Sequence, residues 1–318
     1  MSHLVRSHFP CFELNISEQT HGRRLWEQLF KYPVKGLGVY YSPLGNTKEL
    51  GQGLAIFPYL NFCLTKGKKV NLYFRVAFGL GYLTRRFDTE TNYKNIAIST
   101  HLNAFMQLRY EMRWNITKRL GLAAGLTLSH FSNAAFKVPN LGINIPTVHL
   151  GLSYKLFRET PGQIKNDVPQ ADKRWQFAVV GRFGVNELYG AGGPKYPYYG
   201  LTGYFMKPLN LKRQIGIGCD IYYSGAVLEM IHRREIAIKS RFEAIRPGLS
   251  FVYIMNFSHL SLVLHLGAYL YNKENSDGYF YDRVALQYTV KKHILFQLGL
   301  KTHLMRAEVL EFGFGYKF

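Results

Sequence analysis

Long stretches in which apolar residues occupy every second position limit the fold of this chain more than any other feature. In VNLYFRVAFGLGY (70–82), apolar side chains alternate with residues that are mostly small or polar. A period of two is that of a β-strand, whose successive side chains point to opposite faces. The pattern returns in TVHLGLSYKL (147–156) and in the stretches 259–266 and 294–301. Stretches of this length exceed the usual strand of a soluble sandwich and can cross a bilayer at a tilt.

The alternating stretches are predicted to form one barrel in a membrane. No run of eighteen or more apolar residues lacks a polar interruption, so no transmembrane helix is expected. The most apolar run, 249–270, contains several polar residues and is predicted to be two strands around a short turn. The second face of the strands is small and polar, which suits a barrel lumen. The closing stretch VLEFGFGYKF alternates up to a terminal Phe318, as in bacterial outer-membrane barrels.

We therefore expect an all-β fold, a transmembrane antiparallel up-and-down β-barrel of about fourteen strands, with twelve as the alternative count. Residues 36–318 are expected to form the barrel, and residues 1–35, which do not alternate, to lie outside it. The expected strands are 37–43, 51–65, 70–86, 94–114, 120–132, 147–158, 175–187, 198–209, 214–226, 242–256, 259–272, 282–290, 294–304 and 307–318.

Short turns and longer loops alternate between these strands, as periplasmic turns and extracellular loops do in such barrels. The connection at 159–174 departs from this pattern, because it is long and polar although strand parity places it on the periplasmic side. The first residues, MSHLVRSHFPCFELN, contain no apolar core of a secretory signal. Since an outer-membrane protein carries such a signal, the N-terminus is expected to be missing or misassigned.

The chain has 40 Lys and Arg against 20 Asp and Glu, a formal net charge of +20. The basic residues gather at apparent turns between apolar strands, where lipid headgroups lie, so an anionic lipid surface is the expected partner and nucleic acid is not. These basic turns are Lys66–Lys69, Thr117–Arg119, Leu211–Arg213, His232–Arg234 and Lys291–His293. Cys11, Cys63 and Cys219 are too few and too scattered for a disulfide framework or a metal motif, and we expect no metal or cofactor.

One strand ends in two polar residues of catalytic type. In LGLAAGLTLSHFS (120–132), His130 and Ser132 continue the face formed by the leucines, which is expected to contact lipid. Unpaired polar groups are costly there, unless the strand has already left the hydrocarbon at this point. A second His-x-Ser, at His259 and Ser261, is expected to face the lumen beside a short turn. Parity places the first pair at the extracellular rim of the barrel.

The stretch SHFSNAAFKVPNLGIN resembles the lipid A 3-O-deacylase family, outer-membrane barrels with a serine-esterase site that faces the bilayer. The matching residues are the His-aromatic-Ser-Asn core at 130–133 and the Pro-Asn-x-Gly at 139–142. KGLGVYYSPLGNTKELGQ and NYKNIAISTHLNAF are similar to segments of Bacteroidota-type members. The sharp motif covers about fifteen residues, and a looser resemblance covers 25–158.

This resemblance implies that Ser132 is the nucleophile and His130 its general base, since a serine hydroxyl needs a neighbouring imidazole to accept its proton. Where characterised members carry a Glu that completes the triad, this chain has Asn144, which can orient the imidazole but stabilises the imidazolium less. The expected oxyanion hole consists of Asn133, Asn140 and Gly142. Both asparagines also fit an Asx turn, which is the alternative for them.

The expected function is removal of an ester-linked acyl chain from lipid A or lipopolysaccharide by an outer-membrane serine esterase. The alternatives are a non-enzymatic barrel that acts as a pore or scaffold, and hydrolysis of phospholipid by the same pair. Candidate cations for the lipid A phosphates are Arg85, Arg86, Lys137, Arg233 and Arg234. Candidate lumen residues are Arg75, His149, Lys155, Arg182, Lys301 and His303.

Overall fold

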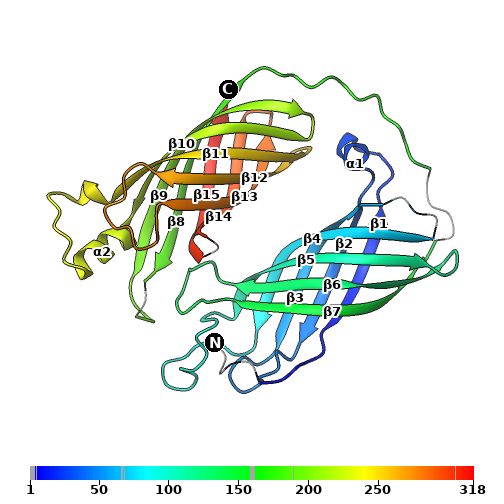
Figure 1. Cartoon of the computed structure of the whole chain (residues 1–318), viewed down its shortest axis with the longest axis horizontal. Helices are drawn as coiled ribbons and strands as arrows, with labels where there is room; N and C mark the ends of the chain where they lie inside the picture. The colour runs from blue at the N-terminus through cyan, green and yellow to red at the C-terminus, as the bar shows by residue number, and fades with distance from the viewer. Residues whose placement is uncertain are drawn as a thin grey trace. The chain divides into compact units, whose positions relative to one another are not determined.

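The computed structural model describes residues 4, 6–65, 67, 69–157, 162–188, 190–304 and 306–318. The chain divides into two compact units (Figure 1). The N-terminal unit comprises Met1–Asn133 and Pro139–Asp167, and the C-terminal unit comprises Ala134–Val138 and Val168–Phe318. None of the described helices is long and apolar enough to cross a membrane.

The N-terminal unit is a sheet of seven strands in chain order, each antiparallel to its neighbours. The strands are β1 (Phe12–Gln19), β2 (Val34–Ser42), β3 (Gly53–Cys63), β4 (Val70–Leu83), β5 (Leu102–Asn115), β6 (Leu120–Ser132) and β7 (Ile143–Tyr154). A short helix, α1 (Leu25–Leu29), lies between β1 and β2. Strands β1 and β7 are the edges of this sheet.

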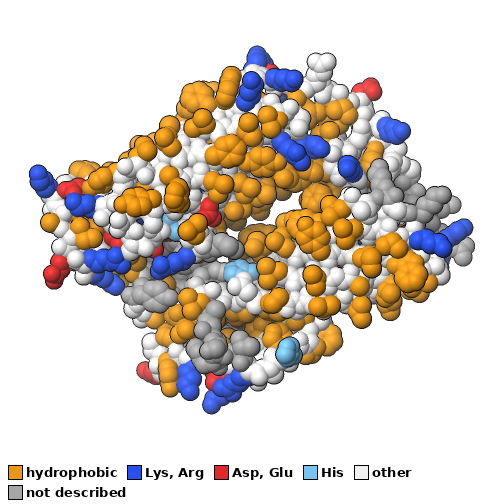
Figure 2. All heavy atoms as spheres, in the orientation of Figure 1, with side chains coloured by type: hydrophobic (Ala, Val, Ile, Leu, Met, Phe, Trp, Pro, Cys, Tyr) orange, Lys and Arg blue, Asp and Glu red, His pale blue; other side chains and the backbone are white. Residues whose placement is uncertain are grey.

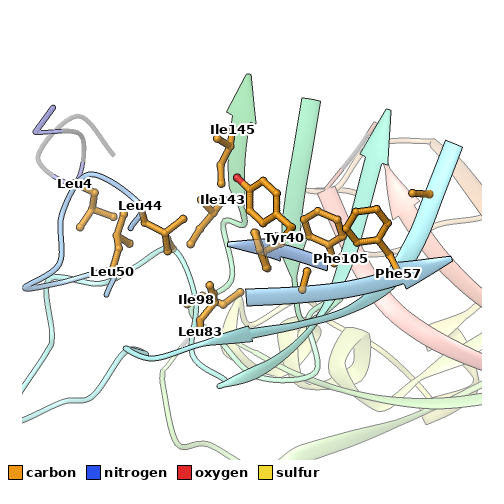
Figure 3. Close-up of a cluster of buried hydrophobic side chains, with 14 of the residues drawn as sticks. Leu4, Tyr40, Leu44, Leu50, Phe57, Leu83, Ile98, Phe105, Ile143 and Ile145 are labelled. Atoms are coloured by element: carbon orange, nitrogen blue, oxygen red, sulfur yellow. The ribbon is translucent and has the colours of Figure 1, made fainter. Parts of the chain in front are cut away.

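Alternation along each strand separates an inner from an outer face of the N-terminal sheet. On the inner face, Tyr40, Phe57 and Phe105 are buried and stack closely, with ring centroids of Tyr40 and Phe57 at 5.4 and 4.9 Å from that of Phe105 (Figure 3). On the outer face, Leu126 and Leu128 are exposed. The outer faces seen in Figure 2 are largely hydrophobic, as a surface in contact with lipid must be.

Charged side chains fill the rest of this interior. Glu13 on β1 binds both Arg75 on β4 and Arg109 on β5 at 2.6 Å. His149 on β7 lies 3.2 Å from Glu111. Pairing offsets the cost of burying these charges. The lumen positions predicted for Arg75 and His149 are therefore confirmed.

The C-terminal unit is a closed antiparallel barrel of eight strands, in which β15 pairs with β8. Its strands are β8 (Gln176–Glu187), β9 (Lys195–Asn210), β10 (Arg213–Ser224), β11 (Ile245–Phe257), β12 (Leu260–Tyr269), β13 (Phe280–Val290), β14 (Ile294–His303) and β15 (Arg306–Lys317). Helix α2 (Gly225–Arg233) and the 3-10 helix η2 (Arg241–Ala244) lie between β10 and β11.

Buried side chains pack the interior of this barrel. Arg283 binds Glu311 at 2.6 Å, and both are buried. Arg182, Lys301 and His303 are also buried, which confirms their predicted lumen positions. Such an interior argues against an open pore. Lys155, by contrast, is exposed just beyond the end of β7, so its predicted lumen position is wrong.

The membrane-type β fold is confirmed, but its organisation differs from the single barrel of about fourteen strands. The described residues contain fifteen strands in two separate sheets. One of them, β1, lies within the segment 1–35 that was expected outside the barrel. The polar connection at 159–174, of which 159–161 lie outside the described residues, runs between the two units. In the basic turn 66–69, Lys66 and Lys68 also lie outside the described residues.

Candidate active site

The predicted nucleophile and base lie at the end of β6 on its outer face. His130 and Ser132 are half-buried and share a side with Leu126 and Leu128, whereas Phe131 between them is fully buried. This is the orientation that the alternation predicts, because residues two apart in a strand share a face. The side chains of His130 and Ser132 therefore point away from the interior of the N-terminal unit.

Asn144 orients the imidazole. It lies opposite His130 in the register of β6 and β7, and its Oδ1 is 2.7 Å from His130 Nδ1. An amide oxygen only accepts hydrogen bonds, so this contact assigns the proton to Nδ1. Nε2 is then left with a lone pair, which is the state that a general base requires.

Gly142 provides the space for the imidazole ring. Its φ is +74°, and a Cβ atom added there would lie 2.7 Å from His130 Cε1. Its backbone N–H donates to the Ala97 carbonyl oxygen at 3.0 Å. Position 142 therefore requires glycine for two reasons: the backbone has a positive φ, and a side chain would collide with the imidazole. The Gly142 N–H is already engaged in its hydrogen bond to Ala97.

Asn140 is the asparagine that reaches the nucleophile. Its Nδ2 donates to Ser132 Oγ at 3.0 Å, and its Oδ1 accepts the backbone N–H of Asn133 at 3.1 Å. The side chain of Asn133 is buried and turns away, donating from Nδ2 to Ser99 Oγ at 3.0 Å. Of the three residues predicted for the oxyanion hole, Asn140 thus donates to Ser132 from its side chain.

The backbone bends sharply just after the nucleophile. Ala134 and Ala135 both have positive φ, at 55° and 61°. Left-handed conformations cost a residue with a Cβ about 1–2 kcal/mol, and such strain concentrates at functional sites. The bend brings Asn140, eight residues after Ser132 in sequence, back to the end of β6.

The segment 95–99 supports the site from inside. It lies in the stretch NYKNIAISTHLNAF that resembles the family, but the sequence did not predict its contacts with the site. Ala97, Ile98 and Ser99 are almost completely buried, and this segment accepts hydrogen bonds from both Gly142 and Asn133. It lies in a stretch predicted to be part of a strand, 94–114, but β5 begins only at Leu102. No spacing in the sequence connects it to the site some forty residues later.

An apolar groove begins beside the candidate pair, His130 and Ser132. It has a volume of about 500 Å³ and lies on the outer face of strands β4 to β7. Leu128 and Pro146, in its wall, lie two residues from His130 on β6 and from Asn144 on β7, respectively. Its lining residues are Phe74, Leu108, Tyr110, Leu126, Thr127, Leu128, Pro146, Thr147 and Val148. A hydrocarbon chain is the ligand that such a lining favours.

The second His-x-Ser and the candidate cations are not part of the arrangement around Ser132. Ser261 is buried and donates to Asn256 at 2.9 Å, while His259 is exposed in the turn before β12, so the second His-x-Ser forms no outward pair. Arg233 and Arg234 bind Glu229 and Glu274 at 2.8 Å each.

Three further candidate cations lie in loops, Arg85 and Arg86 after β4 and Lys137 after β6. No group of three or more His, Cys, Asp or Glu in the described ranges could hold a metal ion.

Comparison with models of protein families shows which family the chain belongs to. The model described as "Lipid A 3-O-deacylase (PagL)" matches residues 12–153, which contain the site. The model described as "Acyloxyacyl hydrolase, C-terminal domain" matches residues 173–318. The chain belongs to the lipid A 3-O-deacylase family. The two matched regions correspond to the two sheets of the structure. No curated protein matches the chain significantly.

Solved structures give only loose similarities. The FrpB iron transporter from Neisseria meningitidis, F3-3 variant, is 8% identical with a TM-score of 0.22, over 98% of this chain and 63% of that one. Its F5-1 variant is 8% identical with a TM-score of 0.23, over 98% and 64%. The chain thus spans less than two thirds of the length of these proteins. Similarities at such TM-scores establish no shared fold.

Proposed function

We propose that this chain is an outer-membrane serine esterase that removes an ester-linked acyl chain from lipid A. The contact between His130 and Asn144 carries this proposal, because it leaves an oriented imidazole beside a serine on the lipid-facing wall. The family comprises enzymes that deacylate lipid A, and the groove beside the pair suits an acyl chain. Contacts with the surrounding outer-membrane lipids follow from the apolar outer faces.

In the first half of the reaction, Ser132 Oγ attacks the ester carbonyl carbon while His130 Nε2 accepts the hydroxyl proton. Asn144 holds the ring in place during this transfer. The negative charge that develops on the carbonyl oxygen is stabilised by Asn140, whose Nδ2 already lies next to Oγ. Collapse of the tetrahedral intermediate breaks the bond to the sugar oxygen, which takes the proton from His130.

Water completes the reaction. His130 removes a proton from a water molecule, the hydroxide attacks the acyl-serine, and the same oxyanion contact forms again. Ser132 regains its proton when the fatty acid leaves. Asn133 and Gly142, predicted for the oxyanion hole, act in this scheme by shaping the backbone around Asn140 and the imidazole.

The test is to incubate the purified chain with lipopolysaccharide and measure the mass of lipid A. The expected result is the loss of one acyl chain with wild type and no loss with Ser132→Ala. An unchanged mass with wild type would refute the proposal, as would equal loss with the variant. Parallel incubation with phospholipid of the same acyl length separates lipid A deacylation from phospholipid hydrolysis.

A further inference from the structure

The two ends of the β8–β15 barrel differ in charge. One end, here called the turn end, contains the start of β8, the C-terminus and the tight turns between β9 and β10, β11 and β12, and β13 and β14. The opposite end, the loop end, carries α2, η2 and the longer connections (Figure 1). Short turns face the periplasm in barrels of this kind, so the turn end is the periplasmic one.

Five cations at the loop end are paired with carboxylates. Their N···O distances lie between 2.6 and 3.5 Å. These pairs are Lys195–Glu187, Arg233–Glu229, Arg234–Glu274, Lys273–Glu243 and Arg306–Asp277. The loop end is therefore close to charge balance, and the excess positive charge of the chain is not concentrated there.

Among the described residues, the turn end has exposed cations that form no salt bridge with a carboxylate. Lys207, Arg213, Lys291 and Lys292 are exposed there. The stretches 200–219, 248–273, 284–307 and 312–318, which contain its turns and the C-terminus, have no Asp or Glu.

The acidic residue nearest this end in sequence is Asp172, before β8, and Arg174 binds it at 2.7 Å. That guanidinium lowers the pKa of the Asp172 carboxyl to about 2, so the carboxylate stays ionised and balances Arg174 alone.

Aromatic side chains surround the turn end at the level where the strands stop. Trp175, Tyr288 and Phe318 are all more than half exposed, and Lys207 Nζ lies 5.6 Å from the centre of the Trp175 ring. Aromatic residues gather at the boundary between hydrocarbon and headgroups. The cations just beyond them are therefore at the depth of lipid phosphates.

The turn between β13 and β14 keeps its two lysines at a conformational cost. Lys291 and Lys292 have φ of 46° and 67°. Consecutive turn residues with positive φ favour Asn and Gly, which adopt this conformation with little strain. Two lysines there are explained by their charge and not by the geometry of the turn.

We propose that the turn end of the C-terminal barrel binds anionic phospholipid headgroups of the periplasmic leaflet. Its exposed lysines and arginine contact the phosphates, while the aromatic residues pack against the glycerol and upper acyl region. Phospholipid, and not lipid A, is the ligand, because lipid A occupies the leaflet at the loop end. This assigns a role to a barrel that carries no outward His–Ser pair among its described residues.

The test compares lipid binding by the full chain in detergent, using native mass spectrometry. Dioleoyl-phosphatidylglycerol and dioleoyl-phosphatidylcholine share their acyl chains and differ in headgroup charge. We expect wild type to retain phosphatidylglycerol preferentially. Each of Lys207→Gln, Lys291→Gln and Lys292→Gln should weaken that preference by roughly fivefold at low salt, and the turn-end triple variant, which combines all three, should weaken it further. High salt should reduce the preference as well.

The matched control removes the same charge at the loop end, in the triple variant Lys239→Gln, Arg241→Gln, Lys273→Gln, and should keep the preference. Equal retention of both lipids by wild type would overturn the proposal, and so would equal losses in the two triple variants. If the turn-end triple variant does not fold, Lys292→Gln alone provides the same comparison. None of these residues belongs to the esterase site, so the outcome is independent of whether lipid A is hydrolysed.

Discussion

Replacing Asn144 by Asp should increase the rate of acyl release. The two side chains have the same length, so a carboxylate oxygen takes the place of Oδ1, 2.7 Å from His130 Nδ1. A hydrogen bond to a charged group contributes about 1.5–3 kcal/mol, against about 0.5–1.5 for a neutral one. The difference of about 1–1.5 kcal/mol applies once the imidazolium has formed, and about 1.4 kcal/mol corresponds to a tenfold change in rate.

We therefore expect Asn144→Asp to raise kcat by about tenfold, with KM unchanged, since only the transition state contains the imidazolium. Asn144→Glu should gain less, because its extra methylene displaces the carboxylate from the ring. Asn144→Ala should lower kcat, because the ring loses its orienting partner.

The assay is the initial rate of fatty-acid release from lipopolysaccharide, with heat-dependent electrophoretic mobility as the check on folding. Leu141→Asp is the matched control, because it adds the same charge at an exposed position in the loop just before β7. A kcat for Asn144→Asp equal to or below that of wild type, in a folded protein, would contradict the assigned role of the residue. An equal gain in Leu141→Asp would attribute the effect to net charge.

Three other substitutions test the surroundings of the pair. Gly142→Ala should lower kcat by at least tenfold, because the new methyl group would lie 2.7 Å from the imidazole, and kinetics with a water-soluble ester would reveal it. Ser99→Ala should lower kcat by about fivefold, because the hydrogen bond that Asn133 donates to Ser99, worth about 1 kcal/mol, is lost; Ser99→Thr should keep the activity, and the equally buried Ser129→Ala is the control. Leu126→Trp should fill part of the groove and shift hydrolysis toward shorter acyl esters, measured across a chain-length series, whereas Leu37→Trp on the outer face of β2 should not.

The sequence was sufficient to predict where the side chains of His130 and Ser132 point. Alternation is a local property of a strand, and the exposed side chains of Leu126 and Leu128 fix the side to which His130 and Ser132 belong. The opposition of His130 and Asn144 across two strands follows from the register of a hairpin whose loop lies between them. Both features depend on residues close in sequence.

Contacts made by loops could not be predicted in this way. The approach of Asn140 to Ser132 depends on a bend at Ala134 and Ala135, two residues whose type gives no sign of positive φ. The support from Ser99 depends on a buried loop that resembles a strand in sequence. Periodicity identifies neither, because it describes one element at a time.

The pairing of the strands was the other feature that alternation in the sequence could not predict. Alternation shows that a segment is a strand with two different faces, but every strand of every outer-membrane sheet satisfies that description. The division into two sheets depends on which strands pair, and in particular on the pairing of β15 with β8. The short β1 was missed because its eight residues alternate only over their first half.

The hydrogen bonds at the site serve two purposes. They give partners to polar groups on the outer face of the sheet, and they orient the groups that ester hydrolysis needs. A polar group on a lipid-facing wall is stable only if it has a partner, and His130 and Ser132 have Asn144 and Asn140. Those same contacts orient the imidazole and hold an amide donor beside the hydroxyl, as ester hydrolysis requires. Two amides were sufficient for the first requirement, since they satisfy polar groups without bringing a charge to the membrane boundary. The carboxylate that would serve catalysis better has a higher cost of desolvation there, so the gain in rate expected for Asn144→Asp should be accompanied by a lower thermal stability.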